Sequence, residues 1–203
     1  MSRRALVGAA VLATALLATG CSSAEEADSA SSSPSPTPTP TPSSVVWAGE
    51  VCLARDNLTA AVGALGRNLS YDVTSDRSAL EQIDRQLRIQ VLSVADAANR
   101  VGTALTGVPV DFVAANDLVV SVTKAKDDAS EAVDATTASL DAMMSADSIL
   151  TGVAEAGKAL VAAKAAFAAG QALVTTVTDA TSTATGELGE AFDAAPQCQD
   201  SGG

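Results

Sequence analysis

The chain has 203 residues, enough for one ordinary domain with appendages and too few for two large domains. Its net charge of −12 argues against nucleic-acid binding, and the absence of histidine removes the most common general base and metal ligand. Hydrophobic residues make up 47% but aromatic residues only 2%, so the apolar content is mainly Ala, Val and Leu, which favours an all-α fold with closely packed helices.

Residues 1–20 have the three-part layout of a secretory signal peptide. Arg3 and Arg4 form a short basic region, an apolar stretch follows as far as Leu17, and three small residues complete the segment. An apolar run of about 15 residues is shorter than the roughly 20 that a membrane-spanning helix needs. We therefore expect the segment to be removed during export.

The next residue, Cys21, follows the sequence LATG, and this stretch resembles the lipobox of bacterial lipoproteins. In that family the cysteine thiol is joined to a diacylglyceryl group and the chain is cleaved just before the cysteine. The resemblance implies that Cys21 carries the lipid. Two acyl chains give stable anchoring, so the mature protein would stay on the extracytoplasmic side of the cell membrane. Plain secretion with a coincidental cysteine is the alternative.

Residues 21–45 are rich in Ser, Thr and Pro. Five prolines occupy every second position from Pro34 to Pro42, and no aliphatic residue larger than alanine occurs between residues 22 and 44. Such a segment cannot build a core and favours an extended rod rising about 3.1 Å per residue. We expect a disordered tether that spaces the next domain from the membrane, with glycosylation of its Ser and Thr left open.

From residue 45 onward, apolar residues recur at spacings of three and four, as in amphipathic helices. Breakers divide this part into four predicted helices: 46–69, from Ser78 to before Pro109, from there to Met143, and 148–194. Ser78 and Glu81 have the spacing of a capping box at the start of the second. The boundary between the third and fourth, at MMSADS, carries weak stop signals, so one kinked helix is an alternative.

This sustained spacing, with Ala and Gly on the apolar faces, predicts an up-and-down antiparallel four-helix bundle over 46–198 and a disordered tail over 199–203. Lys126 falls on the apolar face of the third helix and is expected to lay its aliphatic stem along that face while its charge reaches water. Trp47, at the end of the tether, is expected to pack on the end of the bundle.

Three cysteines are an odd number for an exported protein. If Cys21 carries lipid, Cys52 and Cys198 remain as a pair near the two ends of the predicted bundle. Four alternating helices return the chain to the end at which it started, whereas three would separate these residues by a helix length. Because a disulfide needs Cα atoms within about 7 Å, the sequence predicts a Cys52–Cys198 bond and four helices together.

One cluster of carboxylates is a candidate metal site: Asp127, Asp128, Glu131 and Asp134. Carboxylates at this density can bind a divalent cation, but the cluster lacks the glycine and the oxygen spacing of a calcium loop. Asp127 and Asp134 are seven residues apart and lie off the apolar face. We expect a solvated acidic surface, with a weak cation site as the alternative, and no cofactor.

An anchor, a tether and a helical domain without catalytic groups look like many exported lipoproteins of high-GC Gram-positive bacteria, the actinobacterial type. We therefore expect a non-enzymatic interaction or spacer module of the cell envelope, with a cell-wall or exported protein partner. The alternative is a carrier of a small ligand or lipid in a cavity between helices. Small residues such as Ala163, Gly170 and Ala184 can leave such a gap or pack tightly. The sequence does not specify the partner or the oligomeric state.

Overall fold

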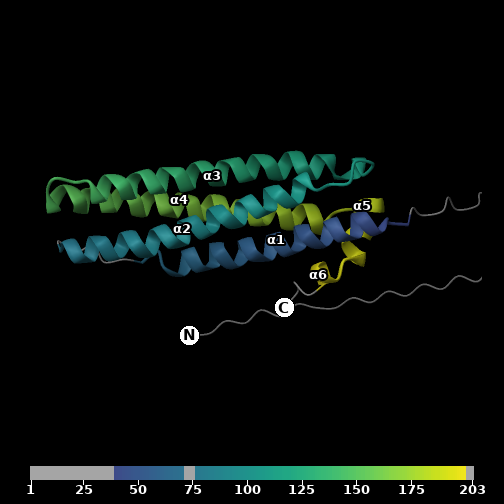
Figure 1. The fold of residues 1–203 in the computed structure, drawn as a ribbon, viewed down its shortest axis with the longest axis horizontal. Coiled ribbons are helices and arrows are strands. Elements are labelled where there is room, and N and C mark those ends of the chain that lie inside the picture. Colours follow the sequence, from purple (N-terminus) through teal and green to yellow (C-terminus); the bar gives the residue numbers. More distant parts are fainter. Residues whose placement is uncertain (1–38, 71–75, 200–203) are drawn as a thin grey trace, which may run out of the picture. The chain divides into compact units, whose positions relative to one another are not determined.

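The computed structural model describes residues 39–70 and 76–199, and in these ranges all regular structure is helical (Figure 1). The elements are α1 (Pro42–Arg67), α2 (Arg77–Thr106), the short 3-10 helix η1 (Val113–Ala115), α3 (Asn116–Met144), α4 (Ile149–Ser182), α5 (Gly186–Ala194) and α6 (Pro196–Gln199). The predicted all-α class is thus confirmed for this part of the chain. The signal peptide, Cys21, most of the tether and residues 200–203 of the tail lie outside the described residues.

Helix α1 begins at Pro42, four residues before the predicted boundary of 46. Proline suits the first turn of a helix because its missing N–H would have no partner there and its φ angle already fits. Thr41 caps the helix, and its hydroxyl accepts a hydrogen bond of 3.3 Å from the backbone N–H of Ser44. The last proline of the repeat therefore starts the helix rather than ending the tether.

The capping box predicted at Ser78 is wrong. The N-cap of α2 is Asp76, whose carboxylate accepts 3.2 Å and 2.7 Å hydrogen bonds from the backbone N–H and the hydroxyl of Ser78. Ser78 thus lies inside the first turn. Aspartate caps a helix as well as serine does, and here it precedes serine by two residues.

Helices α3 and α4 are separate, which excludes the single kinked helix. The chain leaves helical geometry after Met144, and Ser148 caps α4 from an extended conformation by accepting a hydrogen bond of 3.1 Å from the N–H of Thr151. The weak stop signals of MMSADS are therefore sufficient to separate the two helices, because Ser148 at the end of this stretch can cap the start of α4.

The predicted fourth helix, 148–194, is wrong in its length, because it breaks after Ser182 and resumes as α5. The hydroxyls of Ser182 and Thr183 both donate to the carbonyl of Asp179, a local pattern that competes with helix continuation. Gly186, with a φ of +62°, then provides the left-handed conformation from which α5 starts.

The long helices lie side by side (Figure 1): α2 packs against α1, α3 and α4, α3 packs along α4, and α1 packs against α4. The buried face of α4 is made mostly of small residues, namely Gly152, Ala156, Ala159, Ala163, Ala166 and Gly170. By length and hydropathy α4 is apolar enough to cross a membrane, a test that core helices also pass. The small face allows neighbouring backbones to approach closely.

Trp47 closes the end of the helical unit at which α1 starts. Its side chain is only 2% exposed, and its ring lies 5.5 Å from the ring of Phe112 in an edge-to-face arrangement and 5.7 Å from that of Phe192 in α5. The indole Nε1 donates to the carbonyl of Ala104 at 2.9 Å. Trp47 thus packs on the end of the helical unit, as expected, and the break before α5 is what brings Phe192 back over it.

Candidate functional site

The predicted pair Cys52–Cys198 has the geometry of a disulfide. The two Sγ atoms lie 2.04 Å apart and the Cα atoms 5.2 Å apart, across 146 positions of sequence. Cys52 is fully buried in α1, whereas Cys198 is partly exposed in α6 and lies beside an open hollow of about 480 Å³. The pairing inferred from the cysteine count is thus found, although the partner sits in an added short helix.

The acidic cluster of α3 lies on the surface. Asp127 pairs with Lys126 at 2.9 Å and Asp128 pairs with Lys124 at 2.9 Å, and both carboxylates are more than half exposed. Glu131 and Asp134 are exposed as well. Within residues 39–70 and 76–199, no group of three His, Cys, Asp or Glu side chains lies close enough to hold a metal ion. The described geometry therefore offers no preformed cation site.

Lys126 behaves as its position on the apolar face predicts. Its stem lies over Gly102 of α2, where a Cβ on the glycine would stand 3.0 Å from the lysine Cδ, and its ammonium reaches Asp127. Gly102 therefore provides the room for the lysine stem. The charge remains at the surface although the stem is packed.

A groove of about 600 Å³ runs between α1 and α4, larger than the hollow beside the disulfide. Its walls are Thr59, Val62, Gly63, Gly66 and Arg67 from α1, and Phe167, Gln171, Val174 and Thr175 from α4. The volume falls within the range typical of small-molecule sites, about 300–1,000 Å³. The groove is therefore the strongest candidate for a binding site in the described part of the chain.

The two walls are held together by two close contacts. A Cβ on Gly66 would stand 2.5 Å from the ring of Phe167, and a Cβ on Gly170 would stand 2.7 Å from Cγ2 of Val62. As the residue number rises along α1 it falls along α4, so the two helices are antiparallel. At Gly170 the small residue allows tight packing rather than a gap, and the hollow lies at the surface beside it.

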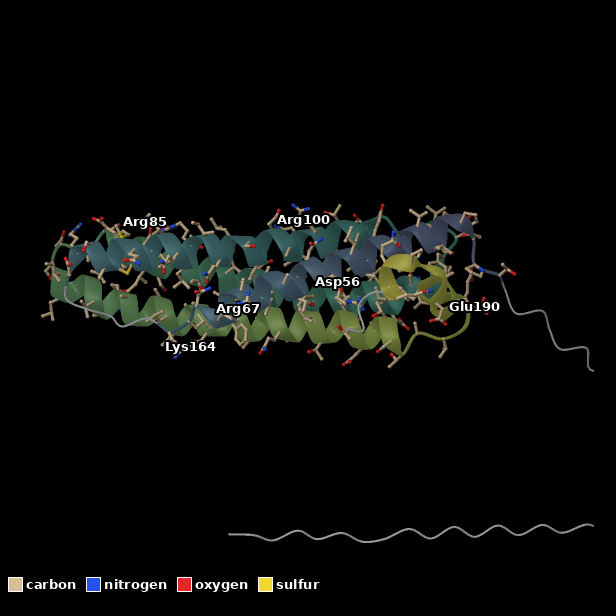
Figure 2. All side chains as sticks on the ribbon, turned by 90° about the horizontal axis from the view of Figure 1, so that it is seen from below. Asp56, Arg67, Arg85, Arg100, Lys164 and Glu190 are labelled. Carbon is tan, nitrogen blue, oxygen red and sulfur yellow. A yellow bond between two sulfur atoms is a disulfide. The ribbon has the colours of Figure 1, made fainter. Side chains whose placement is uncertain are left out.

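Gly63 is what keeps the α1 side of the groove open. A Cβ there would meet only Nη1 of Arg67, at 3.5 Å, so this guanidinium folds back over the glycine into the groove. Lys164 precedes Phe167 by three positions and Gln171 by seven, which places it on the same face of α4. Figure 2 labels Arg67 on α1 and Lys164 on α4, and the contact of Gly66 with Phe167 brings these parts of the two helices together.

These two cations have no acidic partner among the described residues, whereas six of the ten described Lys and Arg residues form ion pairs. The sequence explains why, because no Asp or Glu occurs from residue 57 to 70 or from 156 to 178. Both acid-free stretches line the groove. In a chain of charge −12, the groove is thus a local surface of positive charge.

The comparisons with known proteins provide no relative from which a role can be transferred. No protein-family model, no curated protein and no solved structure matches the chain. The functional argument therefore depends on the tether, the disulfide and the groove between α1 and α4.

Proposed function

We propose that the protein is a lipoprotein held through Cys21 on the extracytoplasmic face of the cell membrane. Its helical unit acts there as a non-enzymatic interaction and spacer module, with a cell-wall or exported protein as its partner. The lipobox resemblance supports the anchor, and the alternating prolines from Pro34 to Pro42 support a spacer between membrane and helices.

The arrangement of the long helices is part of this proposal. We propose that α1 to α4 act as an up-and-down antiparallel four-helix bundle, with α5 and α6 added at its tether end. The antiparallel contacts of α1 with α4 and the packing of each long helix on the next support it. A bundle of this type offers long exposed helix faces to a partner.

One observation carries the spacer role: the helical unit is clamped where the tether joins it. Helix α1 starts at Pro42, the last proline of the repeat, and Cys52, less than three turns later, is bonded to Cys198 in α6, the last helix of the unit in sequence. A pull on the tether therefore acts on the first and the last helix of the unit at once. Helices α1 and α6 cannot be peeled apart without breaking a covalent bond.

The anchor is tested by Cys21→Ser. The unchanged protein should incorporate labelled palmitate and sediment with membranes, whereas the variant should lose the label and appear in the medium. Cys52→Ser is the control, because it removes a cysteine without affecting the lipobox. Equal labelling and membrane association of Cys21→Ser and the unchanged protein would contradict the anchor.

The interaction role is tested by crosslinking in intact cells. The full chain should capture a partner that a version lacking residues 46–198 does not capture. Capture of the same partners by both would show that the helical unit is not the interacting part.

The groove favours a second candidate function, the carriage of a small ligand or lipid. This proposal differs from the sequence expectation in place, because the hollow lies on the surface between α1 and α4 rather than among the core residues. Native mass spectrometry of the full chain purified from its own cells should then show a retained small molecule. Protein that carries no noncovalently bound mass, beyond the covalent lipid expected on Cys21, in any preparation would contradict carriage.

A further inference from the structure

We infer that the groove between α1 and α4 is a binding site for a single-chain anionic amphiphile, specifically a fatty acid, with the carboxylate held by Arg67 and Lys164. The inference rests on the second proposed function and deepens it by naming the chemistry of the ligand. It does not depend on the first proposed function, the interaction and spacer role.

The floor of the groove suits an acyl chain. Val62, Phe167 and Val174 supply apolar surface, and Gly63 adds no side chain of its own, so that only the guanidinium of Arg67 lies over it. From Thr59 to Arg67 the groove follows α1 for about 12 Å at 1.5 Å per residue. An extended acyl chain placed along it removes its own apolar surface and that of Phe167 from water, at about 25 cal/mol per Å².

The head-group preference follows from where the charges lie. Because α1 and α4 are antiparallel, the backbone positions of Arg67, the last residue of α1, and of Lys164, one turn before Phe167, share one end of the groove. The guanidinium of Arg67 reaches from this end back over Gly63. Thr59 and Thr175 lie at the other end, and no acidic residue occurs in either wall. A ligand with one anionic end and one apolar end therefore has a single favoured orientation.

A carboxylate fits this end of the groove. A guanidinium presents paired N–H donors to a carboxylate, and such charge-assisted hydrogen bonds are about twice as strong as neutral ones. Arg67 and Lys164 pay no cost of breaking an existing ion pair, since neither has one among the described residues. A cationic amphiphile would meet the same two charges as repulsion, and a neutral one would gain only the apolar contact.

The inference is tested with the full chain and three probes that share a twelve-carbon chain: laurate, dodecanol and dodecyltrimethylammonium, each below its micelle concentration. Calorimetry measures affinity, and the amide signals of Gly63 and Gly66 in nuclear magnetic resonance spectra report binding in the groove. We expect laurate to bind one to one, to shift both glycine signals, and to bind at least tenfold more tightly than dodecanol.

Two sets of variants test whether laurate binds in the groove and whether the two cations hold its carboxylate. Gly63→Leu should fill the groove and abolish laurate binding, while Gly157→Leu, at an exposed position of α4 with nothing within 4 Å of its Cβ, should leave it unchanged. The double variant Arg67→Gln, Lys164→Gln should weaken laurate at least tenfold and leave dodecanol unchanged. Arg85→Gln, which removes an exposed cation of α2, is the charge control. Circular dichroism checks that each variant folds.

Each contrary result identifies what fails. Dodecanol binding in the groove as tightly as laurate would overturn the anionic head group and leave carriage standing. Laurate binding that Gly63→Leu does not affect would overturn the location. No binding of any probe in the groove would overturn the inference, and carriage would then depend on the mass spectrometry alone. A dimer that Gly63→Leu dissociates would assign the groove to a second copy of the chain.

Discussion

The indole Nε1 of Trp47 lies 2.9 Å from the carbonyl oxygen of Ala104, so that α1 is joined by a buried hydrogen bond to the last turn of α2. The same carbonyl also accepts a hydrogen bond of 3.2 Å from the N–H of Gly107. Loss of the indole therefore leaves this oxygen with one partner rather than none. The ring contacts with Phe112 and Phe192 contribute separately, through buried area and edge interactions.

Trp47→Phe should lower the free energy of unfolding by about 2 kcal/mol, because it removes a buried hydrogen bond and leaves a partial cavity. Urea unfolding followed by circular dichroism measures the change. Val46→Ala, at a neighbouring residue that is 64% exposed, is the control and should change stability by less than about 0.5 kcal/mol. Equal effects of the two substitutions would show that Trp47 does not hold this end together.

Gly170→Ala should destabilise the protein by about 1 kcal/mol. A helical glycine replaced by alanine gains up to about 1 kcal/mol of intrinsic stability, but overpacking of a closed contact costs about 1–3 kcal/mol. Here the new methyl would stand 2.7 Å from Cγ2 of Val62, a β-branched side chain with little rotamer freedom. Thermal and denaturant unfolding measure whether the free energy of unfolding falls or rises.

The matched control for this substitution is Gly157→Ala on the same helix. A Cβ there meets nothing within 4 Å, so only the helix propensity acts and stability should rise by about 0.5–1 kcal/mol. In the Gly170→Ala background, Val62→Ala should cost less than it does alone, because it provides room for the added methyl. Additive effects of the two changes would contradict the close contact.

Removal of the disulfide, by Cys52→Ala with Cys198→Ala, should lower the free energy of unfolding by about 4–5 kcal/mol. The bond closes a loop across 146 positions, and the chain-entropy argument assigns this value to a loop of that size. The melting temperature should fall by about 10–15 °C in calorimetry. The unchanged protein under a strong reductant should match the double variant, and unequal melting of the two would contradict the entropic origin.

Sequence periodicity placed the long helices well, because their buried faces are continuous. Helix α2 buries Leu80, Val91 and Leu105 on the face that the spacing predicts. The break near residue 183 was missed for the opposite reason, since Ala184 and Leu188 continue the spacing of threes and fours across it. The hydroxyl groups that end α4 interrupt the backbone without interrupting the apolar pattern.

The groove was not predicted for a different physical reason. The acid-free stretches 57–70 and 156–178 are visible in the sequence, but nothing there shows that they face each other. Their meeting depends on the register of α1 against α4, which is fixed by the contacts of Gly66 with Phe167 and of Gly170 with Val62. The Cys52–Cys198 pair was predictable because a disulfide requires the two residues to lie close together, whatever the register of α1 against α4.

The pH dependence of α2 should follow the carboxylate of Asp76. Hydrogen bonds from the hydroxyl of Ser78, and next from its backbone N–H, hold the pKa of Asp76 below its usual value of 3.8 in the folded protein. Its contribution to stability is therefore complete above pH 3.8 and is lost as the pH falls through the lower folded-state pKa. Asp76→Asn keeps a capping oxygen but cannot titrate, so it should remove this part of the acid sensitivity.

Carbon-detected nuclear magnetic resonance of the Asp76 side chain measures the pKa directly. The midpoint should lie below 3.8 in the unchanged protein and should move up towards that value in Ser78→Ala, which removes the hydroxyl donor but keeps the backbone donor. Ser145→Ala removes a serine hydroxyl elsewhere and should leave the midpoint unchanged. A midpoint that Ser78→Ala does not raise would show that the serine hydroxyl is not what stabilises the charged cap, and the start of α2 would then depend on the backbone N–H alone.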